Sequence, residues 1–156
     1  HPERTPDMAF TAREIEAPPS EVFAVLADPT TYPDWMIGAS EIRDHDQNWP
    51  SPGAKFHHMV GVKPFVLADS TEVIDVEPDR RLKLRVRSRP LVVDEATFEL
   101  VGDDERCVVT LTEVPAFRPF GDLVRPFADP VLHARNHRSL ARLADVVHRR
   151  RTAAVG

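Results

Sequence analysis

The residues that suggest chemistry gather in the last third of the chain, in a segment with helical periodicity. Asp129, His133 and Asn136 are three or four residues apart and therefore share one face of an α-helix. The same face continues into Leu140, which is typical of core packing. This order predicts that the second half of the helix packs on a sheet, while its first half covers a partly polar cavity. The alternative is that Pro130 rotates the helix and leaves Asp129 and His133 in solvent.

His58 is the second candidate for chemistry. It alternates with Phe56 and Val60 in a strand-like stretch, and only one of His57 and His58 can point inward. If the Phe56 face is the inner one, His58 adds an imidazole to the cavity. An imidazole exchanges protons near neutral pH, as a cyclisation or dehydration requires. His58, His133 and Asn136 are thus the catalytic candidates if the protein is an enzyme; otherwise His58 is a core histidine bonded to a neighbouring hydroxyl.

Glu113 is expected to point inward if Val109 and Leu111 do, because side chains alternate along a strand. A buried carboxylate needs a partner, since an isolated charge away from water is very costly. His58 and Arg13 are the candidate partners. The alternative is that Glu113, near the end of its strand, is exposed to solvent.

Other kinds of site are not indicated. His133 and His137 have the spacing of two ligands on one helix face, but neither an HExxH motif nor a complete ligand set accompanies them. No nucleophile elbow, phosphate-binding glycine loop or Cys–His pair is present, and we interpret Cys107 as structural. We therefore expect no metal and no cofactor.

Composition limits the partners. The net charge is −5, which argues against a nucleic-acid binder. The alternating cations from Arg81 to Arg89 are expected to face water, paired with acidic residues of adjacent strands, while Leu82 and Leu84 face inward. No apolar run approaches the roughly 20 residues of a membrane span. A single cysteine and the lack of a signal-like start favour the cytoplasm.

Turn residues divide the chain into one strand, two short helical segments, six further strands and one long helix. The first strand is Met8–Glu16, a short helix ends before Pro29, and Thr30–Met36 forms a second helix or turn. The strands are expected at Ser40–Asp46, Lys55–Val62, Phe65–Glu77, Arg81–Ser88, Leu91–Val101 and Arg106–Val114. The helix runs from Phe120 to Arg150, with Pro126 and Pro130 bending or interrupting its first turns. We expect one domain over 8–151, with flexible tails at 1–7 and 152–156.

This order of elements resembles the START/SRPBCC superfamily, and within it the polyketide cyclase/dehydrase-like proteins. The matching words are Ile15-Glu16-Ala17-Pro18, then Val22-Phe23, Leu26, Asp28, Pro33 and Trp35, and later Val73-Ile74-Asp75-Val76-Glu77-Pro78. The resemblance implies an α+β helix-grip fold, in which a curved antiparallel sheet wraps around the long C-terminal helix. It also implies a monomer or homodimer that binds a small hydrophobic or amphipathic molecule, lipid-like or polyketide-like, in an internal cavity. The alternative that it implies is a polyketide aromatase/cyclase or dehydratase.

The expected ligand-binding residues combine aromatic and polar side chains. They are Trp35, Met36, Phe56, His58, Phe65, Phe98, Glu113, Phe117, Phe120, Asp129, His133 and Asn136. Specifically, we expect Asn136 and His133 to project into a void shared with His58, Trp35 and Phe56. A solid core would instead favour a protein-interaction domain.

Overall fold

The structure is a computed structural model that describes residues 9–37, 39–62, 65–88, 92–117 and 121–155. Within these ranges, the side chains of 9, 39–41, 43, 58–62, 65–69, 88, 92–93, 115–117, 121–129 and 131 lie outside the description.

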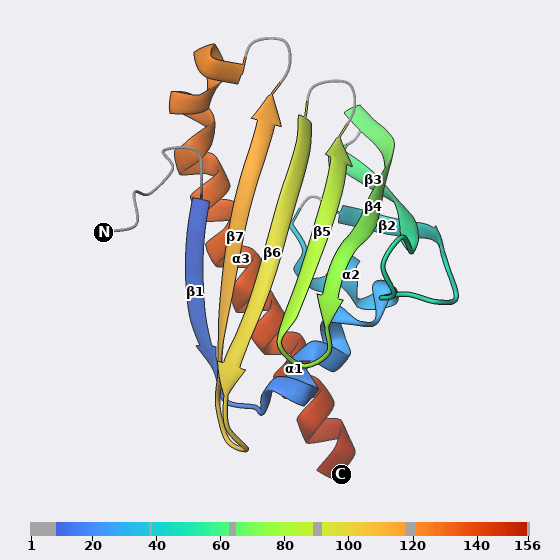
Figure 1. The fold of residues 1–156 in the computed structure, drawn as a ribbon, viewed down its shortest axis with the longest axis vertical. Helices are drawn as coiled ribbons and strands as arrows, with labels where there is room; N and C mark the ends of the chain where they lie inside the picture. The colour runs from blue at the N-terminus through green and yellow to red at the C-terminus, as the bar shows by residue number, and fades with distance from the viewer. Residues whose placement is uncertain (1–8, 38, 63–64, 89–91, 118–120, 156) are drawn as a thin grey trace.

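One antiparallel sheet and one long helix form the frame (Figure 1). The strands are β1 (Ala9–Ile15), β2 (Ala39–His45), β3 (Lys55–Val62), β4 (Phe65–Glu77), β5 (Arg81–Ser88), β6 (Val92–Gly102) and β7 (Cys107–Phe117). Their order in the sheet is β1-β7-β6-β5-β4-β3-β2, so β1 pairs with the last strand and the others form a meander. The helices are α1 (Pro19–Leu26), a 3-10 turn η1 (Pro29–Thr31), α2 (Tyr32–Trp35) and α3 (Gly121–Val155).

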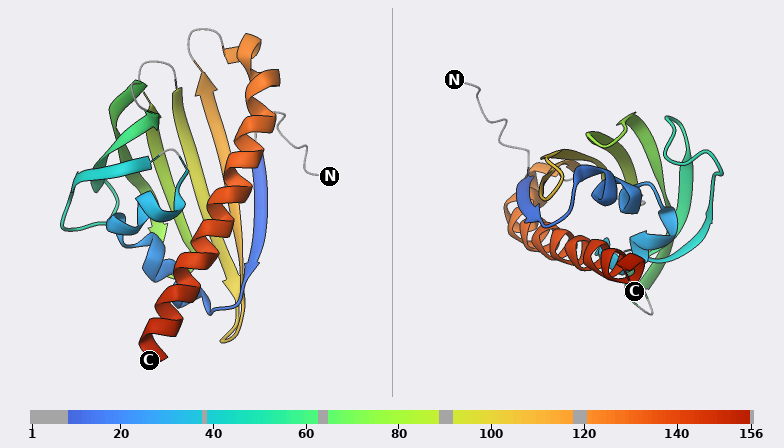
Figure 2. Two further views of the ribbon diagram at one scale, coloured as in Figure 1. Left: turned by 180° about the vertical axis from the view of Figure 1, so that it is seen from behind. Right: turned by 90° about the horizontal axis from the view of Figure 1, so that it is seen from below.

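The sheet curves around α3, which crosses its concave side (Figure 2). The short helices lie on the same side, nearer to the end of the sheet from which the C-terminal turns of α3 project (Figure 1). This arrangement confirms the expected α+β helix-grip fold. The prolines do not interrupt α3, which is one continuous helix and continues to Val155, through most of the segment that we expected to be a tail.

Alternation along β5 orients the sheet as expected. Leu82 and Leu84 are fully buried, whereas the cations between them lie on the outer face. Arg81 pairs with Asp75 at 2.6 Å, and Lys83 and Arg85 lie 3.6 and 3.3 Å from Glu95. Arg81, Lys83 and Arg85 are therefore neutralised across strands, as predicted, whereas Arg89 lies outside the described residues.

A cluster of aromatic rings fills the sheet's concave side beside the short helices. Tyr32 lies between Trp35 and Phe56, with ring centroids 4.6 and 4.9 Å away, and Trp49 contacts Phe56 at 4.7 Å. Their polar atoms are bonded locally, because the Tyr32 hydroxyl donates to the Leu26 carbonyl and Trp35 Nε1 donates to Thr31 Oγ1. This half of the grip is a packed core.

Two ion pairs attach the C-terminal turns of α3 to the short helices. Arg150 lies 2.7 Å from Asp28, and Arg151 lies 2.9 Å from Glu21. Among the described residues, no helix is both long enough and apolar enough to cross a membrane.

Candidate functional site

A pair of acidic residues lies on the inner face of two adjacent strands, β6 and β7. Asp94 precedes Ala96 and Phe98 on β6 by two and four residues, so all three point inward. Glu113 follows Val109 and Leu111 on β7 by the same rule. Glu113 pairs in register with Ala96, which places it beside Asp94. Both acids are buried, with 6% and 5% of their surface exposed.

Arg135 of α3 reaches down to these two carboxyls. Its Nη2 donates to Glu113 Oε1 and Oε2 at 2.7 and 2.5 Å, and it lies 3.7 Å from Asp94 Oδ2. The Arg135 side chain is itself half-buried. We call Asp94, Glu113, Arg135 and the adjacent Asn136 the polar cluster.

The charges of the polar cluster do not balance if both acids are ionised. Burial, the neighbouring Glu113 charge and a hydrogen bond to Glu113 raise the pKa of Asp94 from 3.8 to about 8, against the opposing effect of Arg135. Asp94 therefore keeps its proton at neutral pH. One carboxylate and one guanidinium then form a neutral buried pair, as the cost of burying an uncompensated charge requires.

Asn136 extends the cluster along α3. It is 1% exposed, and its Oδ1 accepts hydrogen bonds from Arg135 Nε and Nη2 at 3.4 and 3.3 Å. Its Nδ2 has no hydrogen-bond partner among the described residues, and neither has Asp94 Oδ1. On β1, the buried Thr11 Oγ1 is also unpartnered. Buried polar atoms are rarely left unpaired, so these atoms mark where a bound molecule or water can be held.

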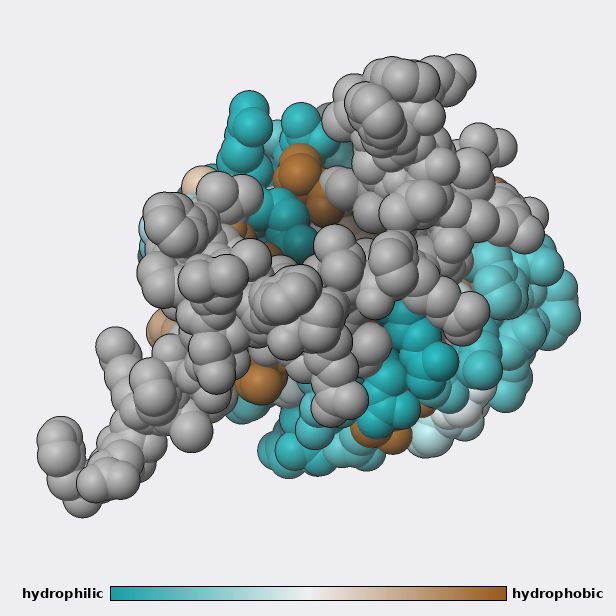
Figure 3. All heavy atoms as spheres, turned by 90° about the horizontal axis from the view of Figure 1, so that it is seen from above, coloured by the Kyte–Doolittle hydropathy of each residue, from teal (hydrophilic) through white to brown (hydrophobic). Residues whose placement is uncertain are grey.

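Apolar side chains connect the polar cluster to the aromatic core. Phe98 lies on the same strand face as Asp94, pairs in register with Leu111, and meets Trp35 edge-on at 5.6 Å between ring centroids. Met36 is half-buried against the same core. The wall below the cluster is therefore hydrophobic. At the nearby end of the sheet, hydrophobic and hydrophilic atoms of described residues lie side by side on the surface (Figure 3).

The structure distinguishes among the residues predicted from sequence. Asn136 and Glu113 are buried as expected, and Glu113 pairs with Arg135, which was not among its expected partners. Arg13 is exposed and cannot fill that role.

His133 does not share the enclosed position that we predicted for it. It is exposed, and its ring lies edge-on to His137 with centroids 4.6 Å apart. The reason is the helix phase, because His133 lies roughly 60° from the direction of Asn136 at 100° per residue. A role of His133 in binding or catalysis stays a prediction.

The aromatic residues that we expected to bind a ligand fall into two groups, those in the packed core and those whose side chains are not described. Trp35, Phe56 and Phe98 are at most 1% exposed and contribute to the packed aromatic core. The side chains of His58, Phe65, Phe117, Phe120 and Asp129 lie outside the described residues. Their part in a ligand site stays a prediction.

Sequence reasoning missed Asp94 and Arg135. The alternation that placed Ala96 and Phe98 inward also places Asp94 inward, so the signal was present in β6. Arg135 lies away from the apolar stripe of α3 and reaches the cluster only through the length of its side chain. Helical periodicity gives no signal for such a residue.

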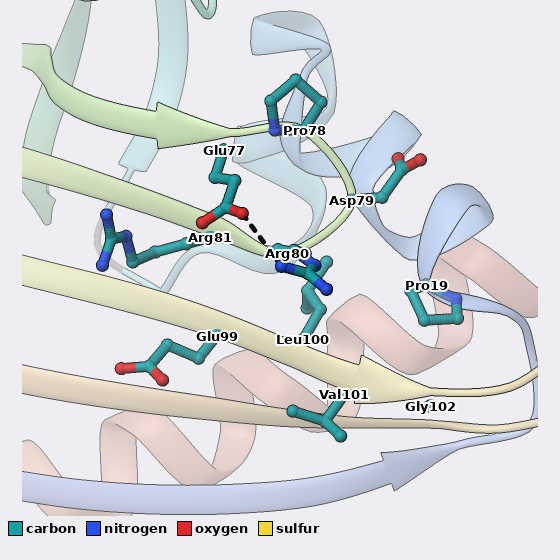
Figure 4. A pocket seen from close by; sticks show the side chains of 10 residues that line it. All are labelled: Pro19, Glu77, Pro78, Asp79, Arg80, Arg81, Glu99, Leu100, Val101 and Gly102. Atoms are coloured by element: carbon teal, nitrogen blue, oxygen red, sulfur yellow. Dashed lines mark hydrogen bonds and ion pairs between the residues drawn. The ribbon is translucent and has the colours of Figure 1, made fainter.

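A hollow of about 670 Å³ lies away from the polar cluster, at the opposite end of the sheet, beside the turns β4–β5 and β6–β7 (Figure 4). Its lining includes Glu77, Asp79, Arg80 and Glu99. Arg80 is paired with Glu77 at 3.1 Å, and no lining residue has a buried polar atom without a partner. The described residues also contain no group of three or more His, Cys, Asp or Glu placed to hold a metal ion. The polar cluster is therefore the better candidate site.

Fold and site together define a helix-grip protein with an acidic pair under its long helix. Residues 9–148 match the family described as polyketide cyclase / dehydrase and lipid transport, and the chain belongs to this family. No curated protein matches the chain.

Several solved structures share the fold. The Zhui aromatase/cyclase from a Streptomyces species has a TM-score of 0.74 at 22% identity, with 96% of this chain and 98% of that chain covered. A protein from Nitrosomonas europaea has a TM-score of 0.74 at 17% identity, covering 96% and 99%. The di-domain ARO/CYC protein BexL has a TM-score of 0.65 at 14% identity, covering 88% of this chain and 48% of that chain. Identities this low support a common fold and carry no residue roles.

Proposed function

We propose that the protein binds a small, largely apolar molecule between the N-terminal half of α3 and the inner face of the sheet. The polar cluster would hold the molecule's polar end. The observation that carries this proposal is the pair of buried atoms without partners, Asp94 Oδ1 and Asn136 Nδ2, at the end of a hydrophobic wall.

The two unpartnered atoms destabilise the folded protein unless something binds to them. Leaving a buried polar group unsatisfied costs about 1–3 kcal/mol. An apolar residue at position 94 or 136 would have no unsatisfied polar atom. The presence of a polar residue at both positions therefore favours a function in binding over a purely structural role. Small-molecule sites are usually lined by apolar side chains, with a few polar groups that orient the ligand.

Native mass spectrometry of the freshly purified protein tests this proposal. We expect an added mass from a co-purified small molecule, or adducts with apolar and amphipathic probes. Asn136→Leu should abolish uptake while leaving the free energy of unfolding unchanged or higher. If no probe binds and Asn136→Leu destabilises the fold by several kcal/mol, Asn136 is a structural tie and the proposal fails.

A polyketide aromatase/cyclase or dehydratase is the second candidate, and the chemistry of Asp94 favours it. A neutral carboxylic acid can donate a proton, and the Arg135 guanidinium beside it can stabilise a developing enolate. An assay with poly-β-ketone substrates distinguishes the two candidates. Turnover that falls about 10²–10⁴-fold in Asp94→Asn would establish acid–base catalysis, whereas binding without turnover would support a carrier. His58 and His133 are tested by alanine substitution in the same assay.

Location and assembly are proposals that rest on composition. The cytoplasm is favoured by the single, buried Cys107. The net charge of −5 favours the absence of a nucleic-acid partner. A monomer or homodimer is the expected state, which light scattering would measure.

A further inference from the structure

The two unpaired atoms of the polar cluster have complementary hydrogen-bonding character. A guanidinium has only donors, so the amide oxygen of Asn136 must face Arg135 and the Nδ2 donor remains free. Asp94 Oδ2 is the oxygen near Arg135, and Oδ1 is the free one. A carboxyl oxygen carries acceptor lone pairs in either protonation state, so the unpartnered Oδ1 is available as an acceptor.

Both free atoms belong to side chains around one nitrogen. Arg135 Nη2 lies 3.3 Å from Asn136 Oδ1 and 3.7 Å from Asp94 Oδ2. The helix α3 therefore supplies a free donor and β6 a free acceptor, and each belongs to a group whose other polar atom lies near Arg135 Nη2. A hydroxyl group can satisfy both with a single oxygen, by donating to one and accepting from the other.

The charge of the cluster argues against an anionic ligand. Arg135 is already paired with both oxygens of Glu113, which is 6% exposed in its side chain. A ligand carboxylate would bring a second negative charge beside Glu113, with no free cation among the described residues of the cluster to offset it. A wholly apolar ligand would leave both free atoms unsatisfied.

We propose that the polar cluster recognises a neutral hydroxyl group, phenolic, enolic or alcoholic, at the end of an apolar ligand, and discriminates against carboxylates. The hydroxyl donates to Asp94 Oδ1 and accepts from Asn136 Nδ2. This inference rests on the proposed function and specifies the class of ligand that the same site takes.

Isothermal titration at pH 7 with 2-naphthol, naphthalene and 2-naphthoate tests the inference on the unmodified chain. We expect 2-naphthol to bind about tenfold more tightly than naphthalene, as one or two satisfied buried hydrogen bonds predict, and naphthoate to bind most weakly. Equal affinity for naphthol and naphthalene, or tightest binding of naphthoate, overturns the inference while the proposed function stands. Failure of all three to bind overturns both.

Variants assign the effect to the cluster. Asn136→Leu should remove the preference for 2-naphthol over naphthalene, and Asn48→Leu, on an exposed loop, should leave it unchanged. The double variant Asp94→Asn/Glu113→Gln leaves Arg135 as the only charge, so naphthoate should overtake 2-naphthol by about tenfold. A preference that survives Asn136→Leu contradicts the assignment. If these variants do not fold, the ligand series on the unmodified chain decides alone.

Discussion

Asp94 holds its proton because two carboxylates and one guanidinium cannot all be charged in a buried space at low cost. Oδ2 of Asp94 is 3.7 Å from Arg135, whereas Glu113 takes the two short hydrogen bonds from the same guanidinium. Arg135 thus stabilises the Glu113 carboxylate more than that of Asp94. Burial, together with the neighbouring Glu113 charge, therefore raises the pKa of Asp94 more than Arg135 lowers it.

The raised pKa of Asp94 predicts a stability that falls as pH rises. In the unfolded chain this carboxyl loses its proton near 3.8, and in the folded chain near 8. Between these values the folded state binds more protons, so its advantage is complete below about pH 4 and is lost as pH rises through about 8. Thermal unfolding of Asp94→Asn should show a flatter profile, with a gain over the parent of about 1–3 kcal/mol at pH 9. Parallel profiles for parent and variant would contradict the assignment of the proton to Asp94.

Glu113 and Glu14 offer a matched pair of glutamates that differ in burial. Glu113 is 6% exposed in its side chain and is bonded to Arg135, while Glu14 is 52% exposed and pairs with Arg106 at 3.0 Å. Removing Glu113 takes two short hydrogen bonds from Arg135, and Asp94 at 3.7 Å replaces only part of that interaction, whereas exposed pairs contribute little. Glu113→Gln should lower the free energy of unfolding by about 1–3 kcal/mol, and Glu14→Gln by less than about 0.5 kcal/mol. Chemical denaturation measures both, and equal effects would show that the cluster contributes no more than a surface pair.

Single residues also show where prediction from sequence ends. Alternation places Glu113 inward correctly, and the same rule applied to β6 would have found Asp94. The partner of Glu113 was not predictable, because strand periodicity gives the direction of a side chain but not which residue of a distant helix meets it. Neighbouring positions on a helix can differ in burial, because Leu132 is buried whereas His133 is exposed.

Among the elements, α3 has two distinct halves. Its C-terminal half buries Leu140, Leu143 and Val147 against the core, and the buried Ser139 accepts a hydrogen bond from the Ile37 backbone N–H at 3.1 Å. Further toward its N-terminus, α3 supplies Arg135 and Asn136 to the polar cluster. One helix therefore anchors the fold with one half and contributes to the candidate site with the other.

Two valines of α3 test this division. Val147 is 1% exposed and Val155 is 89% exposed. Val147→Ala should cost about 2 kcal/mol of unfolding free energy through lost burial and a small cavity, while Val155→Ala should change it by less than about 0.5 kcal/mol. Urea denaturation of both variants measures the difference. A comparable loss in both would mean that the last turn of α3 is packed in solution.

Most elements were predictable because their periodicities are strong and turn residues separate them. The bounds of β3, β4 and β5 match the sequence prediction, and β6 and β7 begin within one residue of it. Of the bend or interruption expected at the prolines of α3, the interruption was wrong, because the helix is continuous. The helix α3 contacts β1, β7, α1 and α2, and tertiary contacts of this kind can outweigh local preference.

At the scale of the whole molecule, the curved sheet supports a packed core and a polar cluster on one inner surface. The aromatic rings of the short helices and β3 fill one part of this surface. The polar cluster lies near the first residues of β6 and the last residues of β7, where Arg135 of α3 reaches the sheet. The family match covers 9–148 and accounts for this frame, but fold alone does not choose between carrier and enzyme. That choice depends on what the cluster holds.

The central claim is that a small, largely apolar ligand binds against the polar cluster, and amide NMR of the labelled protein tests it directly. On titration with 2-naphthol, the side-chain NH₂ signal of Asn136 and the backbone amides of Asp94 and Glu113 should shift first and most, with saturation at one equivalent. The exposed Val101 and Val108, on the outer face of the sheet, should not shift. Shifts confined to the outer face, or no saturable shift at Asn136, would contradict the account.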